Sequence, residues 1–543
     1  MGLRGSLGLN LFSSWVTHAV GLLIGVFLMP YVLHTLGDET YGTWILISSI
    51  AGYSGLLYLG FGSTVGRFVA THYARGEWDQ LNRVVTVVFS VYLALGMVAL
   101  ALAGLVAWLA PGLHDWGSVP LEEVRLVVLI LGLNVAAGLV GSVFGGVLIG
   151  VERFELERGL WMGSAVIRLG LTLLFLAKPG GLLTLSLIFL TVTLLENAGS
   201  LFFAWRVVPQ LSIRPANFSR GTLKEIFSFS IFALIEDISI QLVYATDTVV
   251  IGFLLGAKAI VPYYIAQRLC QFLSKPIMQI GQVFMPRAGA LQAGDDSARL
   301  QALVTRGMGM ALLLSAGMLT GAAFFGQAVI TTWVGPGYEA SYHLLLLLFA
   351  SHVIAMPTGV LRSVLFGMGH ARVPALMYLA QAVANLGLTL LLIGPYGLTG
   401  VAIGTVVPVV LIELGALLPY ALKVLRLDLR TLLLKSVVPQ LLPLLVLAAW
   451  SLAVQQSLST VEGWFRLVLV AGGGGIMLLG TWVLVNRNEL PESLQRWRQK
   501  PLFAADSAVT EEREPECRGT READHQGAPE GQPGEPAIHG TLT

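Results

Sequence analysis

Charged side chains within long apolar stretches are the residues of this sequence best placed to do chemistry. Six of them are basic: Arg67, Arg168, Arg268, Lys275, Arg287 and Arg362. An ionisable group at the centre of a bilayer costs about 2.5 to 3.5 kcal/mol on insertion scales, so each needs a partner or a water-filled cavity. Arginine offers a planar fork of N–H donors that suits phosphate oxygens. The set therefore predicts a binding site for an anionic group, or ion pairs with carboxylates in the membrane.

Carboxylates also occur within the apolar stretches, namely Glu196, Glu236, Asp237, Asp247 and Glu413. Glu236 and Asp247 are about three helical turns apart at ~3.6 residues each, so they share one face of a helix. That face could line a cavity. Asp247 could equally pair with Arg268 on the next helix, while Glu196 and Glu413 pair with other cations. Basic side chains near the helix ends, such as Arg67, could also snorkel to the interface.

The elements that carry these residues are membrane helices. The chain has 543 residues, of which 55% are hydrophobic and only 12% charged, and its mean hydropathy is +0.75. Soluble domains carry roughly 25% charged residues, whereas a membrane helix needs ~20 apolar residues in a row. The pattern predicts an all-α polytopic membrane protein of about fourteen spans, near residues 7–33, 42–69, 84–110, 122–149, 159–177, 182–205, 226–254, 259–285, 302–328, 341–366, 373–393, 397–421, 436–455 and 464–485.

Composition also excludes several classes of function. A net charge of +1 does not favour nucleic-acid binding, and two cysteines in different settings do not make a disulfide framework or a metal site. No phosphate-binding loop is visible, and the loops are too short for a soluble catalytic domain. We therefore expect no enzyme activity and no cofactor.

Lysine and arginine gather on one set of short loops, which predicts that both termini face the cytoplasm. Two stretches of sequence repeat: residues 165–174 (AVIRLGLTLL) resemble residues 382–391 (AVANLGLTLL), and Glu196 and Glu413 share that offset of 217 residues. We expect two six-helix units in the same orientation. The predicted organisation is residues 1–206 (first lobe), 207–224 (cytoplasmic linker), 225–422 (second lobe), 423–490 (two further helices) and 491–543 (disordered cytoplasmic tail).

Two stretches of the sequence carry a family resemblance. MPYVL at residues 29–33, LGDETYGTW at 36–44 and YLGFG at 58–62 form the first, and DTVVIG at 247–252 with Tyr264 forms the second. With this helix plan, the chain resembles the polysaccharide flippases of the multidrug/oligosaccharidyl-lipid/polysaccharide (MOP) exporter superfamily. The resemblance implies a V-shaped fold whose lobes rock between inward-open and outward-open states, with a lipid-linked oligosaccharide as substrate.

The resemblance also implies a site for a coupling cation, Na⁺ or H⁺, between the seventh, eleventh and twelfth spans. The matching polar residues would be Asp237, Asn385 and Thr389. A polysaccharide polymerase and glycosyltransferases would be the partner enzymes, with membrane lipids around the protein and no nucleic acid. A lipid II flippase for peptidoglycan and a cation-coupled multidrug antiporter remain the alternatives.

Overall fold

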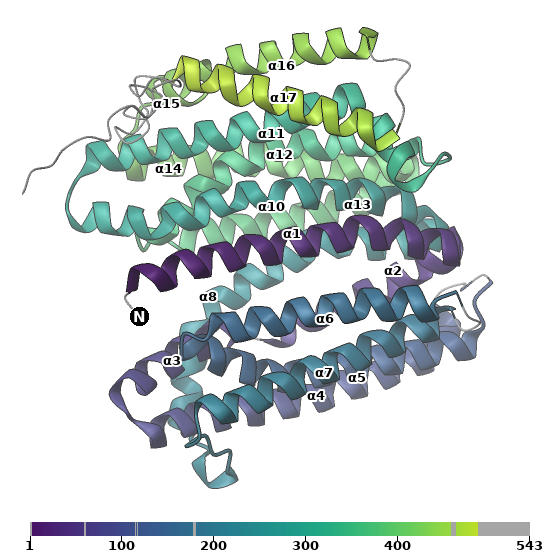
Figure 1. The fold of residues 1–543 in the computed structure, drawn as a ribbon, viewed down its shortest axis with the longest axis vertical. Helices are drawn as coiled ribbons and strands as arrows, with labels where there is room; N and C mark the ends of the chain where they lie inside the picture. The colour runs from purple at the N-terminus through teal and green to yellow at the C-terminus, as the bar shows by residue number, and fades with distance from the viewer. Residues whose placement is uncertain are drawn as a thin grey trace, which may run out of the picture. The chain divides into compact units, whose positions relative to one another are not determined.

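The computed structural model describes residues 3–58, 61–113, 116, 118–177, 181–457 and 463–486, and in these ranges every regular element is a helix. The first half of the chain comprises α1 (Leu3–Leu36), α2 (Asp38–Gly52), the 3₁₀ turn η1 (Tyr53–Tyr58), α3 (Phe61–Arg75), α4 (Trp78–Leu113), α5 (Leu121–Gly150), α6 (Phe154–Phe175) and α7 (Gly181–Val207). Helices α4, α5 and α7 pack side by side (Figure 1).

A linker containing the short turn η2 (Pro215–Asn217) leads to the second half. This half comprises α8 (Arg220–Tyr244), α9 (Thr246–Leu255), α10 (Ala257–Ala293), α11 (Ser297–Val334), α12 (Ala340–Gly367), α13 (Arg372–Val409), the π-helical η3 (Val410–Leu417) and α14 (Leu418–Leu425). Three further helices follow: α15 (Leu429–Ser436), α16 (Val438–Ser457) and α17 (Gly463–Val485). Helices α16 and α17 pack on each other and on α11 (Figure 1).

Each predicted span coincides with helix, but two of them are not the simple rods we expected. The span at 42–69 is broken by η1, where Gly52 and Gly55 lower helix propensity. The span at 226–254 breaks at Ala245, between α8 and α9. The spans at 373–393 and 397–421 are two helices that fold back on each other at Gly397, whose φ is +55°, so that Asn385 of one is hydrogen-bonded to Thr405 of the other.

Within the described ranges, fewer than fourteen helices are long and apolar enough to cross a membrane. Among the described residues, nine helices qualify, and one of them, Arg372–Leu425, covers two predicted spans. The predicted spans that do not qualify are the first, second, seventh and eighth, in the regions of α1, α2 to α3, α8 to α9, and α10. These are corresponding positions in the two halves, and the same helices make most of the contacts between the halves.

The two halves repeat each other in helix order and in local backbone detail. Helices α2 and α10 both begin after a glycine with positive φ, Gly37 at +75° and Gly256 at +92°. A side chain at Gly150 would meet the Gly66 carbonyl of α3 at 2.8 Å, and a side chain at Gly367 would overlap the Met285 carbonyl of α10. Each half thus holds one close helix crossing at the same place.

Contacts between the halves gather where the loops after α1 and α11 lie. The Tyr338 hydroxyl donates to Asp38 Oδ1 at 2.5 Å, and Trp333 Nε1 donates to the Val26 carbonyl at 2.6 Å. One apolar cluster draws buried residues from both halves, including Ile45 and Ile260. In the predicted orientation this end of the helices faces the outside of the cell.

Candidate functional site

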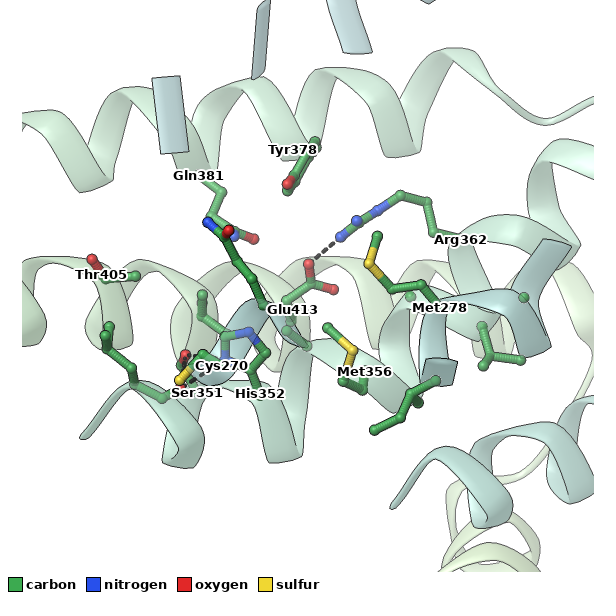
Figure 2. A pocket seen from close by; sticks show the side chains of 18 of the residues that line it. Cys270, Met278, Ser351, His352, Met356, Arg362, Tyr378, Gln381, Thr405 and Glu413 are labelled. Carbon is green, nitrogen blue, oxygen red and sulfur yellow. Dashed lines mark hydrogen bonds and ion pairs between the residues drawn. The ribbon is translucent and has the colours of Figure 1, made fainter. Parts of the chain in front are cut away.

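A polar cavity of about 370 Å³ lies inside the second half, bounded by α9, α10, α12, α13 and η3. Two groups of polar residues line it, one around Asp247 and one around the pair formed by Arg362 and Glu413. Figure 2 shows the second group. The sulfur-bearing side chains of Met278, Met356 and Cys270 also line the cavity. The cavity is of the size that holds small ligands in proteins.

Asp247 is an almost fully buried acid of the cavity, with only 1% of its surface exposed. Its Oδ2 accepts hydrogen bonds from the Tyr263 hydroxyl at 2.6 Å and from Thr405 Oγ1 at 3.0 Å, and its Oδ1 faces Thr389 Oγ1 at 3.4 Å. The Asn385 amide nitrogen lies 3.0 Å from the same Thr405 hydroxyl. Hydroxyl donors therefore offset part of the cost of burying this carboxylate.

One alternative considered for Asp247 was an ion pair with Arg268, and the structure does not show it. Arg268 instead donates to Gln271 Oε1 at 3.0 Å, while Asp247 forms no ion pair within the described part of the chain. Arg268 cannot reach because Asp247 is held by its own hydrogen bonds to α10 and α13. Buried Asn385 Oδ1 also lacks a hydrogen-bond partner among the described residues.

Arg362 and Glu413 form an ion pair across the cavity, from α12 to η3 (Figure 2). Glu413 is 1% exposed, and the Arg362 guanidinium lies 4.4 Å from the centre of the Tyr378 ring. Three buried atoms beside the pair have no hydrogen-bond partner among the described residues: Glu413 Oε2, Arg362 Nε and Gln381 Oε1. Arg362 and Glu413 thus neutralise each other, and the atoms around them keep hydrogen-bonding capacity to spare.

Arg168 and Arg268 come from different halves and lie at the two ends of a row of aromatic rings. The Arg168 guanidinium is 4.5 Å from the Phe189 ring centre, and Phe189 lies 5.2 Å from Trp44. One turn before Trp44 on α2 is Tyr41, whose ring is 6.3 Å from Tyr264, and Arg268 lies 5.5 Å from Tyr264. We call Phe189, Trp44, Tyr41 and Tyr264 the aromatic row.

The remaining predicted site residues are more scattered. Lys275 is exposed on α10, close enough to Arg268 for the two charges to repel each other. Arg67 and Arg287 are exposed on α3 and α10. Glu196 is half-buried and lines a different cavity, in the first half. The side chains of Glu236 and Asp237 lie outside the described residues, and Asp247 is the acid found beside Asn385 and Thr389.

Sequence reasoning missed Tyr263, Thr405, Tyr41 and Trp44. A signal for the first two was present, because a buried carboxylate in a membrane requires donors, and hydroxyl-bearing residues on neighbouring spans are the natural suppliers. Tyr41 and Trp44 lie in the LGDETYGTW stretch that carries the family resemblance, but aromatic residues near the end of a membrane helix are common as interfacial anchors, so neither stood out as a site residue.

Comparison with solved structures identifies the class of fold. The chain superposes on the lipid II flippase MurJ in an inward closed conformation with a TM-score of 0.68, at 14% identity, covering 89% of this chain and 100% of that one. An inward-facing multidrug resistance MATE transporter of the MOP superfamily gives 0.62 at 17% identity, covering 76% and 94%. The fold is that of MOP superfamily transporters, and the protein is a multi-pass membrane protein.

Comparison with protein sequences narrows the class to a family. The family model described as polysaccharide biosynthesis protein matches residues 7–292, and the chain belongs to this family. It is 23% identical over 411 residues to the uncharacterized membrane protein EpsK of Bacillus subtilis strain 168, covering 74% of this chain and 80% of that protein. It is 21% identical over 412 residues to a putative O-antigen transporter of Shigella flexneri, covering 74% and 94%.

Proposed function

We propose that the protein is a flippase that moves a polyprenyl-diphosphate-linked oligosaccharide from the cytoplasmic to the outer leaflet of the bacterial inner membrane. The product would supply cell-surface polysaccharide synthesis, with a polymerase and glycosyltransferases as partner enzymes. Transport would proceed by alternating access of the two lobes, with both termini in the cytoplasm. Membership of the polysaccharide biosynthesis family and the likeness to a putative O-antigen transporter support this proposal.

The observation that carries the proposal is the aromatic row with an arginine at each end. A diphosphate is anionic, and arginine recognises phosphate oxygens through paired N–H donors. Arg168 Nε is buried without a hydrogen-bond partner among the described residues, so a donor is available there. Arg168 belongs to α6 in the first half, and Arg268 belongs to α10 in the second half. Binding of one ligand to both arginines would therefore depend on the relative position of the two halves.

The test is translocation of a fluorescent polyprenyl-diphosphate oligosaccharide in proteoliposomes. We expect Arg168→Gln and Arg268→Gln each to slow translocation by about tenfold or more, because each removes a charge-assisted contact to phosphate. Arg372→Gln serves as the matched control, since Arg372 is exposed at the start of α13. Unchanged rates in both Arg168→Gln and Arg268→Gln would contradict phosphate recognition by these arginines.

We further propose that the Asp247 site binds the coupling cation, and that this cation is Na⁺. Asp247, Thr389, Thr405 and Asn385 would supply oxygen ligands, which hard cations prefer. The fit is supported by the unpartnered, buried Asn385 Oδ1 and by a carboxylate that has no positive partner among the described residues. Bound Na⁺ would supply the positive charge that Asp247 lacks, while Tyr263 holds the carboxylate in place.

A thermal-shift experiment tests the Na⁺ proposal, because a ligand that binds only the folded state stabilises it. We expect NaCl to raise the Tm of the wild-type protein relative to choline chloride at equal ionic strength. Asp247→Asn should abolish this difference, and Glu122→Gln, at an exposed acid on α5, should retain it. An equal Na⁺ effect in Asp247→Asn would place the ion elsewhere.

A further inference from the structure

The first half contains a cavity of about 490 Å³ that corresponds, through the internal repeat, to the cavity around Arg362 and Glu413. Lining positions match at the repeat offset of 217 residues. Glu196 corresponds to Glu413, and Ile149 to Phe366, and all four line their respective cavities. The two cavities are therefore the same structural feature built twice.

The two cavities differ at the position that carries the basic partner of the glutamate. Arg362, which neutralises Glu413, corresponds to Gly145 in the first half. A Cβ built at Gly145 has no neighbour within 4 Å, so the space that arginine fills in the second half is open in the first. Glu196 thus retains the carboxylate of the pair without the partner that the repeat provides elsewhere.

Two carboxylates and a buried amide oxygen line the first-half cavity. Glu196 and Glu157 line it, neither forms an ion pair within the described part of the chain, and no lysine or arginine is among the described lining residues. Asn134 also lines it, and its buried Oδ1 has no hydrogen-bond partner there. Arg168 lies in electrostatic reach of Glu196, with its guanidinium against Phe189, and Arg158 lies in electrostatic reach of Glu157.

We propose that this first-half cavity binds a protonated amine. A ligand with a positive charge and N–H donors complements two carboxylates and an amide oxygen, and it supplies the counter-charge that Arg362 supplies to Glu413. A bare metal ion is a poor fit, because the cavity has the volume of a small-molecule site and no described group of three or more His, Cys, Asp or Glu residues could hold a metal. The proposal goes beyond the transport function proposed above.

An amine of this kind could come from an amino sugar of a lipid-linked saccharide or from a free organic amine. The shared chemistry is the ammonium group, and the experiment separates the two sources. Purified full-length protein in nanodiscs is titrated with glucosamine, with N-acetylglucosamine as the neutral analogue, and saturation-transfer NMR gives the dissociation constants. Ethanolamine, added as a competitor, represents the free amine.

We expect glucosamine to bind the wild-type protein about tenfold or more tightly than N-acetylglucosamine. Glu196→Gln removes the charge with almost no change of shape, and Gly145→Arg installs the missing partner, so each should weaken glucosamine binding by about tenfold or more. Glu122→Gln is the control for the loss of an acid and should bind as wild type does. Displacement of glucosamine by ethanolamine supports a free amine as the ligand, and its failure supports an amino sugar.

Two results would overturn the proposal. One is equal binding of glucosamine and N-acetylglucosamine, and the other is wild-type affinity in both Glu196→Gln and Gly145→Arg. Neither depends on translocation of a lipid-linked oligosaccharide. The amine site can therefore fail while the flippase proposal stands, and the reverse also holds.

Discussion

At the scale of single residues, the cavity of the second half depends on a buried ion pair. Removing one partner of such a pair leaves the other charge uncompensated, whereas replacing both with neutral groups is often harmless. Glu413 is almost fully buried and only 18% of the Arg362 side chain is exposed, so we expect the loss of one partner of this pair to be costly. Three buried atoms at the pair have no hydrogen-bond partner among the described residues, namely Glu413 Oε2, Arg362 Nε and Gln381 Oε1, and they make the site sensitive to any further loss.

Arg362→Met should therefore lower the free energy of unfolding by about 3 to 5 kcal/mol. The double variant Arg362→Met/Glu413→Gln should recover most of that loss, because no unpaired charge remains. Unfolding in mixed detergent micelles measures both, with Arg372→Met as the control within about 0.5 kcal/mol of wild type. A double variant no more stable than Arg362→Met would show that the pair is not what makes the site stable.

The sequence predicted the partners of the buried acids Glu413 and Asp247 only in part. That Glu413 would need a cation follows from its place in an apolar span, but the choice of Arg362 as its partner depends on the η3 segment bringing the two together. For Asp247 the sequence offered Arg268 on the next span, and hydrogen bonds from Tyr263 and Thr405 took that place. Apolar periodicity identifies spans, yet it does not determine which faces of two spans meet.

At the scale of elements, each half is held by a close helix crossing at a glycine. A methyl group at Gly367 would overlap the Met285 carbonyl, and one at Gly150 would lie 2.7 Å from the Val69 side chain. At both crossings the helices are tightly packed, so their backbones cannot easily move apart. The internal repeat of the sequence pairs these two glycines, so the crossing could be located, though not its geometry, from sequence alone.

Gly150→Ala and Gly367→Ala should each destabilise the protein by about 1 to 3 kcal/mol, because the added methyl forces the crossing helices apart. Gly387→Ala is the matched control: its Cβ would meet nothing within 4 Å, and it should be neutral or stabilising by up to about 1 kcal/mol. Thermal denaturation tests this prediction through the change in Tm of each of the three variants relative to wild type. Equal Tm values for Gly367→Ala and Gly387→Ala would be inconsistent with a tight crossing.

The extent of helix was predictable from hydropathy, whereas the breaks were not. Long apolar runs predicted α4, α5 and α11 closely, since lipid requires a helix to satisfy its own backbone. The break at η1 and the junction of α8 with α9 lie in helices at the interface between the halves, where neighbouring helices rather than lipid satisfy freed backbone groups. A count based on apolar length therefore finds fewer spans than the helix pattern does.

At the scale of the whole molecule, the Tyr338 hydroxyl and Asp38 link the two halves at one end of the helices. Loss of the Tyr338 hydroxyl should free that end, since one hydrogen bond contributes about 0.5 to 1.5 kcal/mol. Spin labels at Thr35 and Glu339, measured by double electron–electron resonance, should show about a twofold or larger gain of the long-distance population in Tyr338→Phe. Tyr396→Phe, at an exposed tyrosine, should match wild type.

The same contact should be insensitive to pH in the neutral range. Burial, together with the hydrogen bond to Asp38 and its negative charge, raises the pKa of Tyr338 above its ordinary value. A raised pKa means that the folded state holds the proton, so the contact persists at neutral pH and is lost only as the pH rises through that raised pKa. A wild-type distance distribution that changes between about pH 6 and about pH 9 would contradict this assignment.

The measurement that bears most directly on the central claim compares two cargoes in one preparation. Proteoliposomes containing the wild-type protein are assayed for translocation of a fluorescent polyprenyl-diphosphate oligosaccharide and, separately, for efflux of a cationic dye. We predict translocation of the sugar-linked lipid well above that of protein-free liposomes, without dye efflux. Dye efflux without movement of the sugar-linked lipid would contradict the flippase account and favour a drug antiporter.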